Sequence, residues 1–230
     1  MQRGKSRNNL FFFTLLICAA AFVLWAPASV AAAPASNTIV AVDAGHGGYD
    51  SGIVYNSRSG AQVKEKNADL KIARAIISAI QAKGTGAFAV RQIDQYMDIS
   101  QRARIADAKS PDLFLSVHLS STGAFNIYVT NIPQGQGDLK QFYLYSKRQL
   151  PYIGKSRDFA SVLEQSIKQA FPSVNVTYME IPLPLLNQIE APAVLIECPG
   201  PAFFNYNDAA TSGLIAQAVA NAVTVFNAKR

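Results

Sequence analysis

The sequence contains few of the side chains that form cross-links or bind metals: its 230 residues include two cysteines, two histidines and only five glutamates. Cys18 lies in an N-terminal stretch that has the features of a cleavable leader, so the mature chain retains only Cys198. A single cysteine cannot form an internal disulfide, and the fold must be stabilised by its core. His46 and His118 do not lie near a pair of cysteines, which excludes a zinc finger. A cysteine–histidine nucleophile that uses Cys198 stays open.

Charged residues are also scarce, at 16% of the chain against 50% hydrophobic residues. This composition is typical of a globular domain and excludes a disordered chain or a coiled coil. The formal net charge is +6, but half of it comes from Arg3, Lys5 and Arg7 in the first ten residues. The other lysines and arginines are scattered without a basic run, so we expect no nucleic acid as partner.

The first 31 residues are organised like a secretory signal peptide: cations, then a short apolar stretch, then small residues. We predict cleavage after Ala31 or Ala32, a short linker over 32–37, and export to the periplasm or to the cell wall and extracellular space. After cleavage no stable membrane anchor is expected. The alternatives are an uncleaved anchor, for which the apolar stretch is short, and a lipoprotein modified at Cys18, where the preceding residue is larger than such a site requires.

Residues 38–230 alternate between short apolar runs, which predict buried strands, and amphipathic segments, which predict helices. The predicted strands cover 38–43, 87–91, 113–117, 125–130 and 193–196, and the predicted helices cover 66–83, 99–108, 159–170 and 214–226. This alternation favours an α/β fold: a single-domain sandwich with a mostly parallel central sheet flanked by helices. The sequence shows no internal repeat and no second domain.

Four side chains lie where such a fold places chemistry. His46 follows the first predicted strand, His118 follows the third, Glu197 ends the last one, and Glu65 lies at the start of the first long helix. Ligands and catalytic groups gather beyond the carboxyl ends of the strands in an open α/β sheet, so we expect these side chains to converge. Two imidazoles and a carboxylate are a common ligand set for catalytic zinc, and another carboxylate can act as general base and then general acid.

Each of these residues also has a purely structural interpretation. A single histidine after a strand is more often a hydrogen-bonded structural residue, and Glu65 alone could interact with the dipole of its helix. Glu197 is harder to explain in this way, because it follows the apolar run 194–196, where an unpaired carboxylate is costly. Together the residues favour a metal hydrolase without indicating its substrate.

At these residues the sequence resembles the zinc-dependent N-acetylmuramoyl-L-alanine amidases, which cut peptide stems from the glycan strands of peptidoglycan. The matching segments come in the family's order: VDAGHGGYDSG at 42–52, Glu65-Lys66 with the helix that follows, ISQR at 99–102 with DLFLSVH at 112–118, and APAVLIE at 191–197. The resemblance implies that His46, Glu65 and His118 bind zinc. It also implies that Glu197 is the catalytic carboxylate, which takes a proton from water and passes it to the departing L-alanine amine.

Two segments depart from the family's usual pattern. Leu119-Ser120-Ser121 follow His118 where the family has Ala-Asn-Ala, and the residues after Glu197 also differ, although every implied ligand is retained. Some family members carry a helix that blocks the zinc until a partner removes it. The stretch 131–155 is short and contains prolines and glycines, which leaves no room for a long blocking helix. An activator protein is compatible with the sequence, but nothing in the sequence supports one.

Two other functions remain open: another exported zinc peptidase that acts on wall peptides, and a catalytically inactive peptidoglycan-binding protein. The direction in which the Cys198 side chain points follows from that of Glu197, the residue before it. If Glu197 points into the site, alternation along a strand sends Cys198 to the opposite face. We therefore expect Cys198 to be a small buried hydrophobic residue.

Overall fold

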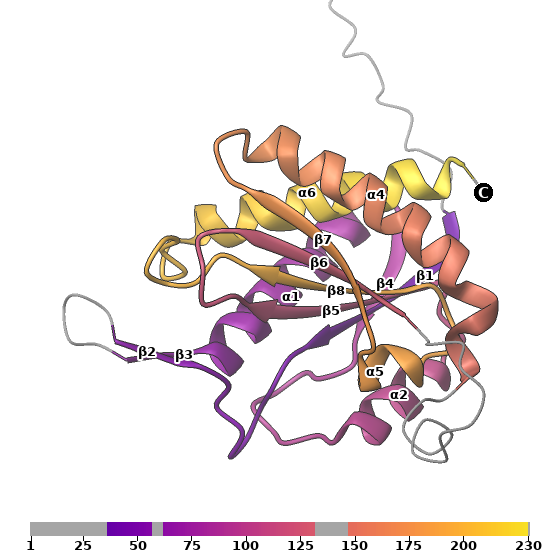
Figure 1. The fold of residues 1–230 in the computed structure, drawn as a ribbon, viewed down its shortest axis with the longest axis horizontal. Helices are drawn as coiled ribbons and strands as arrows, with labels where there is room; N and C mark the ends of the chain where they lie inside the picture. Colours follow the sequence, from indigo (N-terminus) through magenta and orange to yellow (C-terminus); the bar gives the residue numbers. More distant parts are fainter. Residues whose placement is uncertain (1–35, 57–61, 132–146, 230) are drawn as a thin grey trace, which may run out of the picture. The chain divides into compact units, whose positions relative to one another are not determined.

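The computed structural model describes residues 36–56, 62–131 and 147–229. These residues form one compact unit around a six-stranded sheet in the order β4-β1-β5-β8-β6-β7 (Figure 1). The strands are β1 (Ser36–Ala44), β4 (Thr85–Ala89), β5 (Leu113–Leu119), β6 (Phe125–Thr130), β7 (Val176–Ile181) and β8 (Ala193–Cys198). All neighbours in the sheet are parallel except β6 and β8, which pair antiparallel. The mostly parallel α/β fold predicted from the sequence is confirmed.

Helices cover both faces of the sheet because successive strand residues point to opposite sides. In β1, Val40 and Val42 pack into a large core with the helices α1 (Glu65–Ala82), α4 (Ile153–Ala170) and α6 (Ala209–Asn227). Ala41 faces a smaller core with α2 (Ile99–Asp107) and α5 (Pro184–Asn187). In Figure 1, α4 and α6 accordingly lie on one side of the strands, and α2 and α5 on the other.

Local sequence signals account for the helix ends. Asp98 caps α2 by accepting a hydrogen bond from the backbone N–H of Gln101, and the Gln101 side chain accepts one from the Asp98 N–H, which completes a capping box. Asp208 caps α6 by accepting from the N–H of Ala210. Gly84, with a φ of +77°, follows the last turn of α1.

Several short elements were not predicted. They are the antiparallel hairpin of β2 (Val54–Asn56) and β3 (Gln62–Lys64), a 3-10 helix over Lys147–Tyr152, the edge strand β7 and the single-turn helix α5. Each is too short to show a periodic pattern of hydrophobic residues. In addition, β7 is half-exposed, so its sequence lacks the apolar run of a central strand. These elements depend on tertiary partners.

Some boundaries also differ from the prediction. Strands β5 and β8 are longer than predicted, so His118 and Glu197 lie within their strands and each is followed by one further strand residue. β4 starts and ends two residues before the predicted 87–91. β1 begins at Ser36, inside the segment predicted as a linker.

Two predictions fall outside the described residues: the signal peptide over 1–31, and the part of 131–155 that covers 132–146. Within the described part of the chain, α6 is the one helix that is long and apolar enough to cross a membrane. Half of its apolar window is buried, and its buried residues belong to the core that it shares with α1 and α4. The apolar residues of α6 are therefore explained by its packing in the core of the domain.

Candidate metal centre

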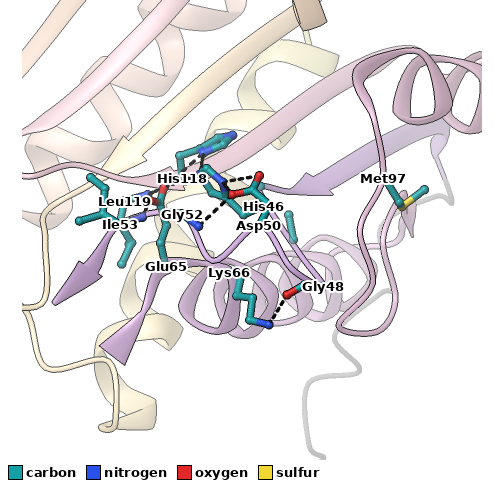
Figure 2. Close-up of polar contacts among 12 residues, drawn as sticks. His46, Gly48, Asp50, Gly52, Ile53, Glu65, Lys66, Met97, His118 and Leu119 are labelled. Atoms are coloured by element: carbon teal, nitrogen blue, oxygen red, sulfur yellow. Dashed lines mark hydrogen bonds and ion pairs between the residues drawn. The ribbon is translucent and has the colours of Figure 1, made fainter. Parts of the chain in front are cut away.

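The topology brings the predicted side chains together at the carboxyl ends of the parallel strands. His46 follows β1 after one glycine, and His118 and Glu197 are register partners near the ends of the parallel strands β5 and β8. Register partners point to the same face, so these two side chains lie side by side. Glu65 begins α1 and reaches the same end of the sheet (Figure 2).

Three ligand atoms form a nearly equilateral triangle. His46 Nε2 lies 3.2 Å from Glu65 Oε1, His118 Nδ1 lies 3.2 Å from His46 Nε2, and His118 Nδ1 lies 3.3 Å from Glu65 Oε1. In a tetrahedral zinc site with bonds of ~2.0–2.1 Å, neighbouring ligand atoms are separated by about 3.3–3.4 Å. The three atoms therefore fit three corners of a tetrahedron around a zinc-sized ion.

The loop after β1 holds His46 in an unusual backbone conformation. His46 has a φ of +54°, a region that non-glycine residues adopt only when surrounding contacts enforce it. Those contacts come from Arg102, whose guanidinium donates to the carbonyls of His46 at 2.6 Å and Ala44 at 2.7 Å. Arg102 also forms a buried ion pair with Asp43, so its own charge is balanced.

A carboxylate orients the His46 ring. Asp50 contacts His46 Nδ1 at 2.9 Å, which leaves Nε2 to face Glu65 and His118. Burial lowers the pKa of His46, but the hydrogen bonds and charges of Glu65 and Asp50 outweigh burial, so the net shift is upward. A carboxylate behind an imidazole is the arrangement that fixes the tautomer and orientation of metal-binding histidines.

Glu65 is 2% exposed and is held at both oxygens. Oε2 accepts from the N–H of Ile53 at 2.8 Å, and Oε1 accepts from the N–H of Leu119 at 3.0 Å. Burial raises the pKa of Glu65. Hydrogen bonds from His118, His46 and the Ile53 N–H lower this pKa by a larger amount, so the net shift is strongly downward. Glu65 is therefore an anion. A Cβ at Gly52 would lie 2.7 Å from its Oε2, so only glycine fits there.

Asp69 belongs to the same cluster and was not predicted. Its carboxylate has a ligand atom within 4.8 Å of the ligand atoms of the other three residues, one turn below Glu65 on α1. Asp69 is fully buried, and its oxygens lack a hydrogen-bond partner among the described residues. Burial and the charge of Glu65 raise the pKa of Asp69 well above its usual range, which favours the neutral form of its side chain.

Glu197 lies beside this cluster but is not part of it. Its Oε2 accepts two hydrogen bonds, from Asn126 Nδ2 at 2.8 Å and from Tyr128 Oη at 2.9 Å. Within the described part of the chain, no hydrogen bond holds Oε1. Burial and the bond to Glu197 raise the pKa of Tyr128 to about 12, so the phenol remains a donor.

Asn126 and Tyr128 were not predicted as site residues. They come from β6, where Asn126 is the register partner of Glu197. The one available signal was the alternation of polar Asn126, Tyr128 and Thr130 with apolar residues along the predicted strand 125–130. That pattern shows a polar face, but it does not show which glutamate the face meets.

Two cavities meet at the histidines. One, of about 490 Å³, contains His46, Glu65, His118, Tyr128 and Glu197. The other, of about 620 Å³, also contains both histidines and extends along the loop before α2. The cluster is thus open on two sides to a molecule larger than a single amino acid.

Cys198 points away from this site. It is fully buried in the core with α1, α4 and α6, and burial raises the pKa of its thiol. The predicted alternation with Glu197 is confirmed. A thiol mechanism at this site is excluded, because a buried, protonated thiol is not a nucleophile.

Comparison with known proteins gives a consistent result. The profile of the N-acetylmuramoyl-L-alanine amidase family matches residues 40–224. The uncharacterized protein YqiI of Bacillus subtilis is 34% identical over 113 residues, which are 49% of this chain and 52% of YqiI. The N-acetylmuramoyl-L-alanine amidase AmiA of Escherichia coli is 36% identical over 80 residues, which are 35% of this chain and 26% of AmiA. The matches thus span about half or less of these relatives.

The fold also matches a solved structure. The CwlD amidase of Clostridioides difficile, determined in complex with the GerS lipoprotein, superimposes with a TM-score of 0.63 at 18% identity, covering 84% of this chain and 100% of CwlD. At that identity the likeness shows the fold alone.

Proposed function

Because the chain belongs to the N-acetylmuramoyl-L-alanine amidase family, we propose that it hydrolyses the amide bond between N-acetylmuramic acid and L-alanine in peptidoglycan. We propose that His46, Glu65 and His118 hold a zinc ion for this reaction. The observation that carries the proposal is the triangle of three ligand atoms at 3.2–3.3 Å, two from imidazoles and one from Glu65, with the carboxylate of Glu197 beside it. In this arrangement three side chains would bind the ion, and Glu197 would remain free to act as a base.

The residues of the chain divide the work. When bound at such a centre, zinc polarises a carbonyl oxygen and makes water more acidic. Two neutral imidazoles and one carboxylate would hold a divalent ion with one positive charge left over, which would favour negative charge on the amide carbonyl oxygen. Asp50 holds the His46 ring so that Nε2 faces Glu65 and His118.

Glu197 moves the proton. Asn126 and Tyr128 bind one oxygen of Glu197, so the other is available to accept the proton of the attacking water. Glu197 then donates this proton to the nitrogen of L-alanine, because an amine leaves only after protonation. The products are a glycan with a free lactyl carboxylate and a stem peptide with a free N-terminal alanine.

The location and partners follow from the substrate. We propose that the protein is exported to the periplasm or cell wall, supported by the signal-like residues 1–31 and by the wall substrates of the family. The CwlD amidase was solved with a lipoprotein partner, so the need for an activator is tested directly by assaying this protein alone.

The test is mass spectrometry of peptidoglycan after digestion by the purified protein. We expect intact stem peptides that begin with L-alanine. Cuts within the stem would instead identify a wall peptidase, and binding without products would identify an inactive binding protein. The Glu197→Gln variant is the control, because it should retain the fold and the zinc while releasing no stems.

A further inference from the structure

Two tyrosines stack on each other at the edge of the proposed active site. The rings of Tyr49 and Tyr96 have centroids 4.2 Å apart and an angle of 21° between their planes. Tyr49 is 80% exposed and Tyr96 is 43% exposed. Stacked aromatic side chains usually lie in a core or an interface. The exposure of this pair shows that it makes little contribution to the core of the domain.

The two loops that carry the pair are bound to each other by a buried lysine. Lys66 Nζ donates to the carbonyl of Gly48 at 2.7 Å (Figure 2) and to Asp94 Oδ2 at 2.7 Å. The other oxygen of Asp94 accepts from the N–H of Gly48 at 2.8 Å. These bonds therefore hold Gly48, the residue before Tyr49, against the loop that contains Asp94 and Tyr96.

Glycines allow this close approach of the two backbones. A Cβ at Gly47 would lie 2.1 Å from the carbonyl oxygen of Gln95, and a Cβ at Gly48 would lie 2.5 Å from the backbone nitrogen of Tyr96. Both glycines also have positive φ values. The tyrosine pair is thus preorganised by the backbone, which reduces the entropy that a ligand must overcome on binding.

The pair continues from the proposed site. Tyr49 lies between His46 and its orienting partner Asp50 in the sequence, and Tyr96 lines the 620 Å³ cavity that also contains both histidines. A long molecule that is cleaved at His46 and His118 and that extends through this cavity would reach the tyrosines.

We propose that Tyr49 and Tyr96 form a binding platform for a sugar ring of the glycan strand, outside the sugar that carries the cleaved amide. This inference rests on the proposed function. A pyranose has a face of C–H bonds that complements the negative face of an aromatic ring, and its polar edge suits the phenolic hydroxyls. A rigid, flat and uncharged surface suits a sugar better than a flexible peptide.

The first test compares two substrates that carry the same stem peptide: glycan strands of several disaccharides, and a single N-acetylmuramic acid. For Tyr49→Ala we expect KM to rise roughly three- to tenfold on the long strands with kcat unchanged, the size expected for one aromatic contact. Kinetics on the single-sugar substrate should stay within about twofold. Tyr178→Ala is the matched control, because Tyr178 is exposed on the sheet face that α4 covers.

The second test does not depend on catalysis. Calorimetry with a peptide-free N-acetylglucosamine hexamer should show binding to the wild-type protein, weakened by Tyr49→Ala and unchanged by Tyr178→Ala. The platform is overturned if the hexamer does not bind, if Tyr49→Ala loses activity equally on both substrates, or if it weakens a glycan-free stem peptide instead. Hexamer binding through Tyr49 in a protein without amidase activity would refute the proposed function and leave the platform standing.

Discussion

The two glutamates of the site lie in regions built in different ways. On the proposed ligand side, formed by His46, Glu65 and His118, Glu65 is almost fully buried, and backbone N–H groups bind both of its oxygens. On the proposed base side, formed by Glu197, Asn126 and Tyr128, two side chains bind one oxygen of Glu197, and its other oxygen has no hydrogen bond within the described residues. A ligand must be fixed, whereas a base needs an oxygen from which a proton can move. We therefore propose that the two environments suit the two glutamates to different roles, ligand for Glu65 and base for Glu197.

The largest effect should come from removing two ligands. We expect the double variant His46→Ala, His118→Ala to lose nearly all of its zinc, starting from about one ion per chain, and all measurable amidase activity, since one carboxylate cannot hold the ion. Elemental analysis of the purified proteins measures the zinc. Full occupancy in the double variant would show that the ion is bound elsewhere.

Replacing each glutamate by glutamine separates the two regions. Glu197→Gln should keep its zinc and lose roughly 10²–10⁴-fold in rate, because an amide cannot accept the proton. Glu65→Gln should mainly lose zinc affinity, since a neutral amide is a poor ligand. Zinc content and rate are measured for both variants in one buffer. The reverse pattern would mean that the two roles are exchanged.

Tyr128→Phe tests whether the base side depends on its hydrogen bonds. Removing a donor to a carboxylate should lower kcat by about tenfold, with zinc content and KM unchanged. Tyr178→Phe is the matched control, because it removes a similar tyrosine–glutamate bond, to Glu180, on the α4-covered face of the sheet. If both variants behave alike, the hydrogen bond to Glu197 has no role in the reaction.

Asp69→Asn tests how many carboxylates the ligand side uses. Because burial and the charge of Glu65 raise the pKa of Asp69, a neutral amide of the same shape should change zinc content and rate by no more than about twofold. Metal titration of the variant against the wild-type protein measures this. A large loss of zinc affinity would make Asp69 a fourth ligand.

Cys198→Ser should have the smallest effect on activity, because Cys198 faces the core on the opposite side of the sheet from Glu197. We expect the rate to stay within about twofold. The free energy of unfolding should fall by ~1–3 kcal/mol, because a buried hydroxyl replaces a thiol. Denaturant unfolding measures the second quantity. A folded, zinc-loaded variant without activity would contradict this assignment.

Most of the fold could be predicted because its central strands and long helices carry their own periodicity. The runs 40–42 and 113–115 are apolar on both faces, as strands covered by helices must be. The β2–β3 hairpin, β7 and α5 could not be predicted, since they are short and depend on neighbours. The predicted leader over 1–31 stays a prediction.

The candidate site likewise contains residues that the sequence could identify and residues that it could not. His46, Glu65, His118 and Glu197 could be identified from the sequence because each lies at the end of a recognisable element. Asp69 could not, because a carboxylate inside an amphipathic helix is usually solvated, and the burial of Asp69 results from packing.

The sequence by itself determined which residue types lie at the ends of the strands, and hence the class of chemistry. Only the tertiary structure decided their geometry: the 3.2–3.3 Å triangle, the pairing of Glu197 with Asn126 and Tyr128, and the stacking of Tyr49 on Tyr96. The physical reason is that the contacts that set strand register and loop positions join residues that lie 70 or more positions apart, such as His46 with His118 and His118 with Glu197. No local pattern encodes such distances.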